Sequence, residues 1–227
     1  MWTQNLCRVS LGSCRVLAWH GNIFIIYPVG LACRRIHLCM LTIGHSTLPI
    51  NSFVHALKEN GVALLVDVRT IPRSRHNPQF GMEELAASLH AAGIRYRWMQ
   101  SLGGLRHSRK DSINMGWHNT SFRGYADYMQ TDAFAAALKE LMALDEESTV
   151  AIMCSEAVPW RCHRSLIGDA LLVHEHTVDD IFVTTAGKSN RKPHTLTTFA
   201  RVQGARLWYP EQPTLPLSSP EVRQLRC

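Results

Sequence analysis

Short runs of Val, Ile and Leu alternate with helix-patterned segments from residue 39 to residue 183, and this alternation constrains the fold more than any other feature. The run VALLVDV (62–68) has no polar face, which is typical of a strand covered on both sides. Strands that alternate with helices form largely parallel sheets with helices on both faces. The pattern therefore predicts one three-layer α/β domain with a mostly parallel central sheet of about five strands.

The individual elements follow from periodicity and from their end signals. Gly61 and Gly93 end two of the expected helices, and Thr131-Asp132 is an N-cap pair at which a long helical pattern can break. A long loop covers about 100–120, and a short helix near 195–204 is considered. The expected strands are 39–44, 62–68, 94–99, 149–154 and 177–183, and the expected helices are 48–61, 82–93, 125–144 and 162–175.

The domain is expected to span 40–209, with a leader over 1–39 and a loose, Pro-rich tail over 210–227. The apolar run 21–32 is too short for a membrane span, which needs about 20 residues. For residues 1–39, an overextended start or a dispensable leader is favoured over a targeting segment and over a folded part of the domain. Of the net charge of +6, the leader's four arginines carry +4, so the body carries an ordinary +2.

The seven cysteines are unevenly placed, because four of them precede Met40 and Cys227 ends the chain. An odd number with irregular spacing argues against a secreted disulfide scaffold and favours a reducing compartment, here the cytoplasm. The body of the chain keeps only Cys154 and Cys162.

Polar clusters follow three of the expected strands, and parallel strands would bring them to one edge of the sheet. The loop with Gly103 and Gly104 follows a fourth strand and emerges at the same edge. This convergence is the main argument for a functional site. The clusters are Gly44-His45-Ser46, Asp67 with Arg69, and Cys154-Ser155-Glu156.

Cys162 has the surroundings of a reactive thiol, because Arg161, His163 and Arg164 flank it at the start of a helix pattern. Positive charge and free backbone N–H groups stabilise a thiolate. A strand-ending Cys154, a loop and an arginine resemble the phosphatase and rhodanese arrangement, in which amides and arginine hold an oxyanion. The loop to Arg161 is one residue longer than in phosphatases, and Pro159 removes one amide, so only the principle is shared.

Each of these residues also has a structural interpretation. Asp67 can form a buried ion pair with Arg69 or Arg73, and Ser46 can cap the next helix. His45 can be a hydrogen-bonded structural residue, and Cys154 a small buried hydrophobe. His45, Asp67, Cys154, Cys162 and His163 include zinc-type ligands, but without a close CxxC or HxxxH pair no metal is assigned, and the sequence names no cofactor.

The segment 69–123 is basic, with nine Lys or Arg against three acidic residues. Trp98, Trp117, Phe122 and Tyr125 interleave these cations, as in surfaces that bind phosphates and stack bases. A solvated basic surface over core aromatics is the plainer interpretation.

The motifs TIGHS, DVRTIPRSR, LGG, FRGYADYM and MCSEAVPWRCHRSLIGDAL, taken in this order, resemble the bacterial family called domain of unknown function 488. The resemblance covers about residues 41–183 and implies no established activity. It implies that the family's motif positions are His45, Asp67, Arg69, Gly103, Gly104, Tyr125, Cys154, Glu156, Cys162, His163 and Arg164.

Together these observations predict a thiol-dependent transferase or hydrolase acting on an anionic, phosphate- or nucleotide-bearing substrate, without a membrane partner. The alternative is a nucleic-acid or nucleotide binding module without catalysis. The candidate catalytic residues are Cys154, Cys162, His45, Asp67 and Glu156. The candidate substrate-binding residues are Arg69, Ser46, Gly103, Gly104, Tyr125, Arg161, His163 and Arg164.

If 1–39 is a leader outside the domain, a chain that begins at Met40 should fold and keep the full thermal stability of the longer chain. Thermal unfolding of the two chains, followed by circular dichroism, checks this. A large fall in Tm for the shorter chain would contradict it.

Overall fold

The computed structural model describes residues 17–20, 23–26, 39–184 and 187–212. Its contacts divide the chain into two units, Met1–His37 and Leu38–Cys227. In the first unit, β1 (Leu17–His20) pairs antiparallel with β2 (Ile23–Ile26). The rest of the expected leader up to residue 38, and the tail from residue 213, lie outside the described residues.

The second unit is built on a six-stranded sheet with the order β5-β4-β6-β3-β7-β8. Its first five strands in this order are mutually parallel, and β8 pairs antiparallel with β7, so the predicted α/β fold with a mostly parallel sheet is confirmed. The strands are β3 (Met40–Gly44), β4 (Leu64–Asp67), β5 (Arg95–Trp98), β6 (Val150–Cys154), β7 (Val178–Val183) and β8 (Ser189–Pro193).

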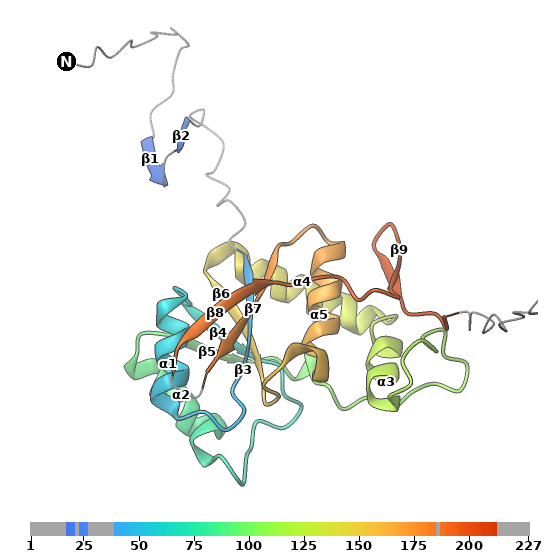
Figure 1. The fold of residues 1–227 in the computed structure, drawn as a ribbon, viewed down its shortest axis with the longest axis horizontal. Helices are drawn as coiled ribbons and strands as arrows, with labels where there is room; N and C mark the ends of the chain where they lie inside the picture. The colour runs from blue at the N-terminus through green and yellow to red at the C-terminus, as the bar shows by residue number, and fades with distance from the viewer. Residues whose placement is uncertain (1–16, 21–22, 27–38, 185–186, 213–227) are drawn as a thin grey trace, which may run out of the picture. The chain divides into compact units, whose positions relative to one another are not determined.

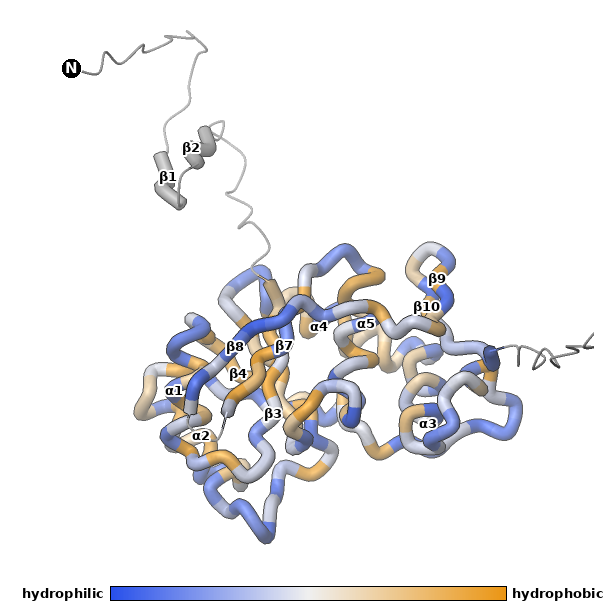
Figure 2. The backbone as a smooth tube through the Cα atoms, in the orientation of Figure 1, coloured by the Kyte–Doolittle hydropathy of each residue, from blue (hydrophilic) through white to orange (hydrophobic). Residues whose placement is uncertain are grey.

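The strand β8 is absent from the sequence-based expectation because its residues, SNRKP, carry no apolar pattern. It lies at the edge of the sheet and is mostly exposed, so pairing with β7 places it there without burial of its own side chains. Figure 2 shows this contrast, with a hydrophilic β8 beside an apolar β7. The expectation that β5 lies at an edge is confirmed.

Alternate residues of each strand point to opposite faces of the sheet, and both faces are covered by helices. Val150 and Ile152 pack into one apolar cluster, while Ala151 and Met153 pack into the other. The helices α1 and α2 lie on one side of the sheet, and α4 and α5 on the other (Figure 1). The helices are α1 (Ile50–Glu59), α2 (Met82–Ala91), α3 (Thr120–Tyr128), α4 (Asp132–Glu147) and α5 (Arg164–Val173), with 3-10 turns η1 (Pro78–Phe80), η2 (Gln100–Leu102) and η3 (Pro159–Arg161).

Side-chain caps decide where the helical pattern around residue 130 begins and breaks. The Asn119 side chain accepts hydrogen bonds from Ser121 and Phe122 N–H groups, so α3 begins before the expected residue 125. The Thr131 side chain accepts from the Phe134 N–H and separates α3 from α4, as the Thr131-Asp132 pair predicts. Among the described residues, no helix is long and apolar enough to cross a membrane.

The short helix considered near 195–204 is wrong. The chain there forms a hairpin of β9 (Arg201–Gln203) and β10 (Arg206–Trp208), with Gly204 at a φ of 57° in the turn between them. Leu207 and Tyr209 pack into the same apolar cluster as α4 and α5. Burial of these two side chains holds the segment against the domain.

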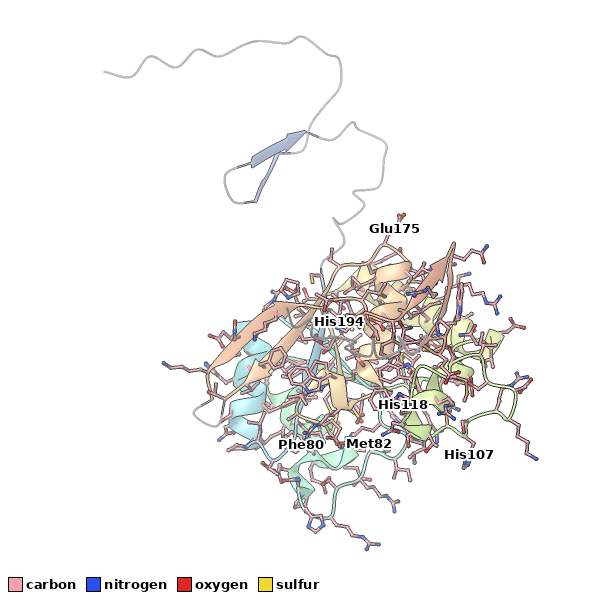
Figure 3. All side chains as sticks on the ribbon, turned by 45° about the vertical axis from the view of Figure 1, so that its right-hand side comes forward. Phe80, Met82, His107, His118, Glu175 and His194 are labelled. Atoms are coloured by element: carbon pink, nitrogen blue, oxygen red, sulfur yellow. The ribbon has the colours of Figure 1, made fainter. Side chains whose placement is uncertain are left out.

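A buried polar chain joins this C-terminal segment to the sheet. His194, labelled in Figure 3, lies between Asp180 of β7 (3.0 Å) and Asp169 of α5 (3.2 Å). The Tyr209 hydroxyl donates to Asp169, and the Thr42 hydroxyl of β3 donates to Asp180. Burial alone would lower the pKa of His194, but hydrogen bonds to the two carboxylates raise it to about 9 from 6.5.

A protonated His194 should therefore stabilise the fold at or below pH 6.5 and lose this effect as pH rises through 9. We expect His194→Gln to lower the free energy of unfolding by about 3 kcal/mol at pH 6.5 and by much less above pH 9. Urea denaturation across this pH range measures the difference. His55→Gln, on the exposed side of α1, is the control, and an H194Q effect that does not change with pH contradicts the protonated state.

Candidate functional site

The parallel strands end at one edge of the sheet, and a cavity of about 390 Å³ lies among the loops that follow them. A second cavity of about 450 Å³ adjoins it and shares His45, Ser74, Ser155, Glu156 and Arg161. The lining of the first cavity consists of His45, Arg69, Thr70, Ile71, Arg73, Ser74, Gly104, Leu105, Ser121, Phe122, Cys154, Ser155, Glu156, Arg161, Cys162 and His163. The predicted convergence of strand-end polar residues is therefore present.

The loop 155–163, between β6 and α5, forms the cysteine-bearing wall of this cavity. It packs directly against the end of β3, where a Cβ on Gly44 would overlap the Glu156 carbonyl oxygen. Cys162 lies two residues before α5, and the Arg164 backbone N–H donates to its Sγ at 3.5 Å. Cys162 is therefore placed at a helix N-terminus, where unpaired N–H groups favour a negative sulfur.

Arg164 is 1 % exposed and holds the cysteine loop to the sheet. Its guanidinium donates to the Thr42 hydroxyl (3.1 Å) and to the Glu156 carbonyl oxygen (2.8 Å). In the described part of the chain it has no carboxylate partner, and its Nε has no hydrogen-bond acceptor. A buried cation without a carboxylate favours any anion nearby, and the Cys162 sulfur is such a group.

The Cys154 and Cys162 sulfurs lie within 4.8 Å of each other, and this proximity separates the acidities of the two thiols. Burial by itself would raise the pKa of Cys162, but the neighbouring Cys154 thiol and the charge and backbone N–H of Arg164 lower it below its ordinary value. The neighbouring Cys162 sulfur, together with burial, raises the pKa of Cys154. At neutral pH the arrangement favours a Cys162 thiolate beside a protonated Cys154.

His163 contacts both the Cys162 sulfur and the residue that follows β4. Its Nε2 lies 3.0 Å from the Val68 carbonyl oxygen, which only accepts, so this nitrogen carries a proton. Its Nδ1 then faces Cys162 Sγ at 3.7 Å. Gly104 lies against the ring, because a Cβ there would overlap it, and Tyr125 packs behind it with ring centroids 4.9 Å apart.

His45 is a neutral, immobilised imidazole. Its Nδ1 lies 2.9 Å from the Ser46 carbonyl oxygen and donates to it, so Nε2 is left to accept from Arg69 at 3.3 Å. Burial, followed by the Arg69 and Arg164 charges, lowers its pKa to about 4 despite the bond to Ser46. The ring also stacks on Phe80 at 4.1 Å, and Figure 3 shows Phe80 at the lower end of the domain. Both ring nitrogens are engaged, so His45 mainly positions Arg69.

Asp67 is fully buried and satisfied by its neighbours. Arg69 binds it through the backbone N–H, Nε and NH2, the last at 2.6 Å, and the Tyr96 hydroxyl donates to it at 2.8 Å. Of the partners left open by the sequence, Arg69 is the one that pairs. Asp67 does not line the cavity, whereas Arg69 does, so the carboxylate orients a cation toward the cavity.

The structure thus brings most of the predicted site residues together and places the others around them. Ser46 lines the adjoining cavity, and α1 has Pro49 at its N-cap, so the capping role considered for Ser46 is wrong. The predicted residues that line the main cavity are His45, Arg69, Gly104, Cys154, Glu156, Arg161, Cys162 and His163. The predicted residues that do not line it are Asp67, Ser46, Gly103, Tyr125 and Arg164.

Several residues with a part in the site were not singled out as site residues. Thr42 and Tyr96 lie inside strand patterns, and only the strand order brings them to Arg164 and Asp67. The segment after Arg69 contributes Thr70, Ile71, Arg73 and Ser74, and its TIPRSR sequence was a visible signal. Leu105, Ser121 and Phe122 enter through the long loop and the start of α3, whose path the sequence did not predict.

Cys154, Cys162 and His163 form the group that could hold a metal ion among the described residues, with ligand atoms within 4.8 Å of one another. Two sulfurs and one imidazole suit Zn²⁺ in type and leave its fourth position open. The charge of the surroundings argues against Zn²⁺, because Arg69, Arg161 and the buried Arg164 lie near the sulfurs. Such a cationic cavity favours an anion over a divalent cation.

Comparison with known proteins gives one match. The family model described as domain of unknown function DUF488 matches residues 49–171, which is more than half of the chain. The predicted resemblance is therefore confirmed. No curated protein and no solved structure matches the chain significantly.

The Asp67–Arg69 pair has an exposed counterpart with the same two-residue spacing, Arg109–Asp111. We expect Asp67→Ala to lower the free energy of unfolding by about 3–5 kcal/mol, because it leaves the Arg69 charge buried and unpaired. Asp111→Ala should leave stability essentially unchanged, since Asp111 and its partner Arg109 are both solvated. Urea denaturation of both variants checks this, and equal effects would contradict the buried role.

Proposed function

The chain belongs to the DUF488 family, whose description names no activity, and we propose from its own cavity that it is a thiol-dependent transferase or hydrolase for an anionic, phosphate-bearing substrate. The observation that carries the proposal is the position of Cys162. Its sulfur lines the cavity, accepts the Arg164 N–H, and has its pKa lowered by Cys154 and Arg164 although burial opposes this.

The anionic part of the substrate would be held by cations at the cavity wall. Arg69 is fixed there by Asp67 and His45, and Arg73 and Arg161 line the same space. In the described part of the chain, neither Arg73 nor Arg161 forms an ion pair. A phosphate group neutralises such guanidinium groups with short, charge-assisted hydrogen bonds.

In the reaction, the Cys162 thiolate attacks the electrophilic centre of the bound substrate and displaces its leaving group. Glu156 is exposed at the rim of both cavities and is the group placed to exchange a proton with the leaving group or with water. His45 is less suited to this role, because Ser46 and Arg69 occupy its two nitrogens. Water or a second substrate then releases the group from sulfur.

Binding of nucleic acid by the basic segment 69–123 is the second candidate. Many of its cations are engaged within the protein, since Arg97 pairs with Glu140, Arg109 with Asp111, and Arg106 lies over the Tyr128 ring at 3.7 Å. Trp117 packs against Phe122 with centroids 4.8 Å apart. Fewer groups are therefore free for phosphates and bases, and the enzyme is favoured. A salt-sensitive mobility shift with DNA or RNA would support the second candidate instead.

The proposal predicts selective alkylation of Cys162 across a pH series. Iodoacetamide should modify it with a midpoint well below the free thiol value of about 8.5, because its thiolate is stabilised. Cys39 is the control, since burial raises its pKa. Peptide mapping by mass spectrometry assigns the modified residue. A midpoint at or above about 8.5 for both Cys154 and Cys162 would rule out an activated nucleophile.

Inorganic phosphate should slow this alkylation by binding at Arg69, Arg73 and Arg161 in the cavity. We expect Arg161→Ala to weaken the protection about tenfold while leaving alkylation without phosphate nearly unchanged. Arg191→Ala is the matched control, because Arg191 lies on β8 and pairs with Asp179 outside the cavity lining. Protection that is equal in both variants would remove Arg161 from the site.

A further inference from the structure

Cys154 is a second sulfur beside Cys162, and the proposed transfer reaction uses it only to favour the Cys162 thiolate, not as a nucleophile. It ends β6, is 6 % exposed, and lines the same cavity as Cys162. The two sulfurs and a ring nitrogen of His163 lie within 4.8 Å of one another, and His163 Nδ1 is 3.7 Å from Cys162 Sγ. Attack by one thiolate on a phosphoryl group needs no second nucleophile, so this pairing allows a further chemistry.

The two thiols match the two roles that thiol–disulfide exchange requires, an attacking thiolate and a resolving thiol. Exchange begins with attack by a thiolate on a disulfide sulfur and ends when a second thiol resolves the mixed disulfide. The two sulfurs lie within 4.8 Å of each other and only Cys162 accepts the Arg164 backbone N–H, so this placement favours ionisation of Cys162 and protonation of Cys154. The order of events is therefore set, with Cys162 attacking first and Cys154 adjacent to the adduct.

His163 is placed to remove the proton from Cys154. Its Nε2 proton is committed to the Val68 carbonyl oxygen, so Nδ1 presents a lone pair on the side of the two sulfurs. The ring is held by Gly104 on one side and by Tyr125 on the other. It can accept the Cys154 proton without leaving its position.

We propose that Cys162 and Cys154 form a dithiol–disulfide couple that reduces an anionic, low-molecular-weight disulfide bound in the cavity. The proposal rests on the proposed function only in taking Cys162 as the reactive sulfur. Carboxylates on the disulfide would be held by the cations that would hold phosphate, Arg69, Arg73 and Arg161.

The reaction balances in two steps. The Cys162 thiolate attacks one sulfur of the substrate RS–SR, which forms a Cys162–SR bond, breaks the substrate disulfide and releases RS⁻, protonated by water. Cys154 gives its proton to His163 and attacks Cys162 Sγ, which forms the Cys154–Cys162 disulfide and releases the second RS⁻. The substrate gains two electrons and the protein loses two, and a small dithiol such as dithiothreitol returns the protein to its reduced state.

The test uses the full, reduced chain with oxidised glutathione as the probe at neutral pH. Peptide mapping by mass spectrometry should find a disulfide between Cys154 and Cys162, which dithiothreitol reverses. Cys154→Ser should stop at a glutathione mixed disulfide on Cys162. Cys162→Ser should slow modification of Cys154 at least about tenfold, since burial still raises the pKa of its thiol when the Cys162 sulfur is gone. Cys39→Ser is the control and should leave the Cys154–Cys162 disulfide unchanged.

The outcomes separate this inference from the proposed function. If Cys162 is alkylated readily but the unsubstituted chain accumulates only the mixed disulfide, the couple is overturned and the proposed nucleophile stands. If neither iodoacetamide nor glutathione modifies Cys162, both proposals fail. If the purified chain retains stoichiometric zinc that Cys162→Ser loses, the sulfurs are metal ligands, and the couple is again overturned.

Discussion

The buried guanidinium of Arg164 is the interaction on which the rest of the site depends. It bonds Thr42 in the middle of β3 and the Glu156 carbonyl in the cysteine loop, while its own backbone N–H reaches Cys162 Sγ. One residue thus fixes the loop to the sheet and supplies positive charge beside the sulfur. Among the described residues no carboxylate forms an ion pair with this charge, so its burial favours ionisation of the sulfur.

A second fixed cation, Arg69, lines the cavity itself. Asp67, which the Tyr96 hydroxyl also binds, and His45 hold Arg69 in place, so its position costs little side-chain entropy when an anion binds. The two arginines differ in use, because Arg164 is enclosed and acts on the protein's own sulfur, while Arg69 lines the cavity. In the proposed function, this division lets one site both activate a thiol and receive an anionic ligand.

The proposed activities share this machinery and differ in their need for Cys154. Transfer of a phosphoryl group uses the Cys162 sulfur and the arginines, whereas disulfide reduction also uses Cys154 as the resolving thiol and His163 as its proton acceptor. Both chemistries depend on the Cys162 sulfur, which is nearly buried yet lines the cavity. Nearby charges act more strongly on a thiolate in such an environment than in water.

The sequence by itself determined the strand–helix alternation, the parallel sheet and the edge at which the polar residues meet, because apolar periodicity and strand direction are local properties written in VALLVDV and TVAIMC. It did not reveal β8, the β9–β10 hairpin or the start of α3, since a polar edge strand and side-chain caps carry little periodic signal. It also left the contacts of Asp67 and the two thiols open. Only the tertiary structure decided these contacts, because the neighbours of a buried group are distant in sequence, such as Tyr96 at Asp67 and Thr42 at Arg164.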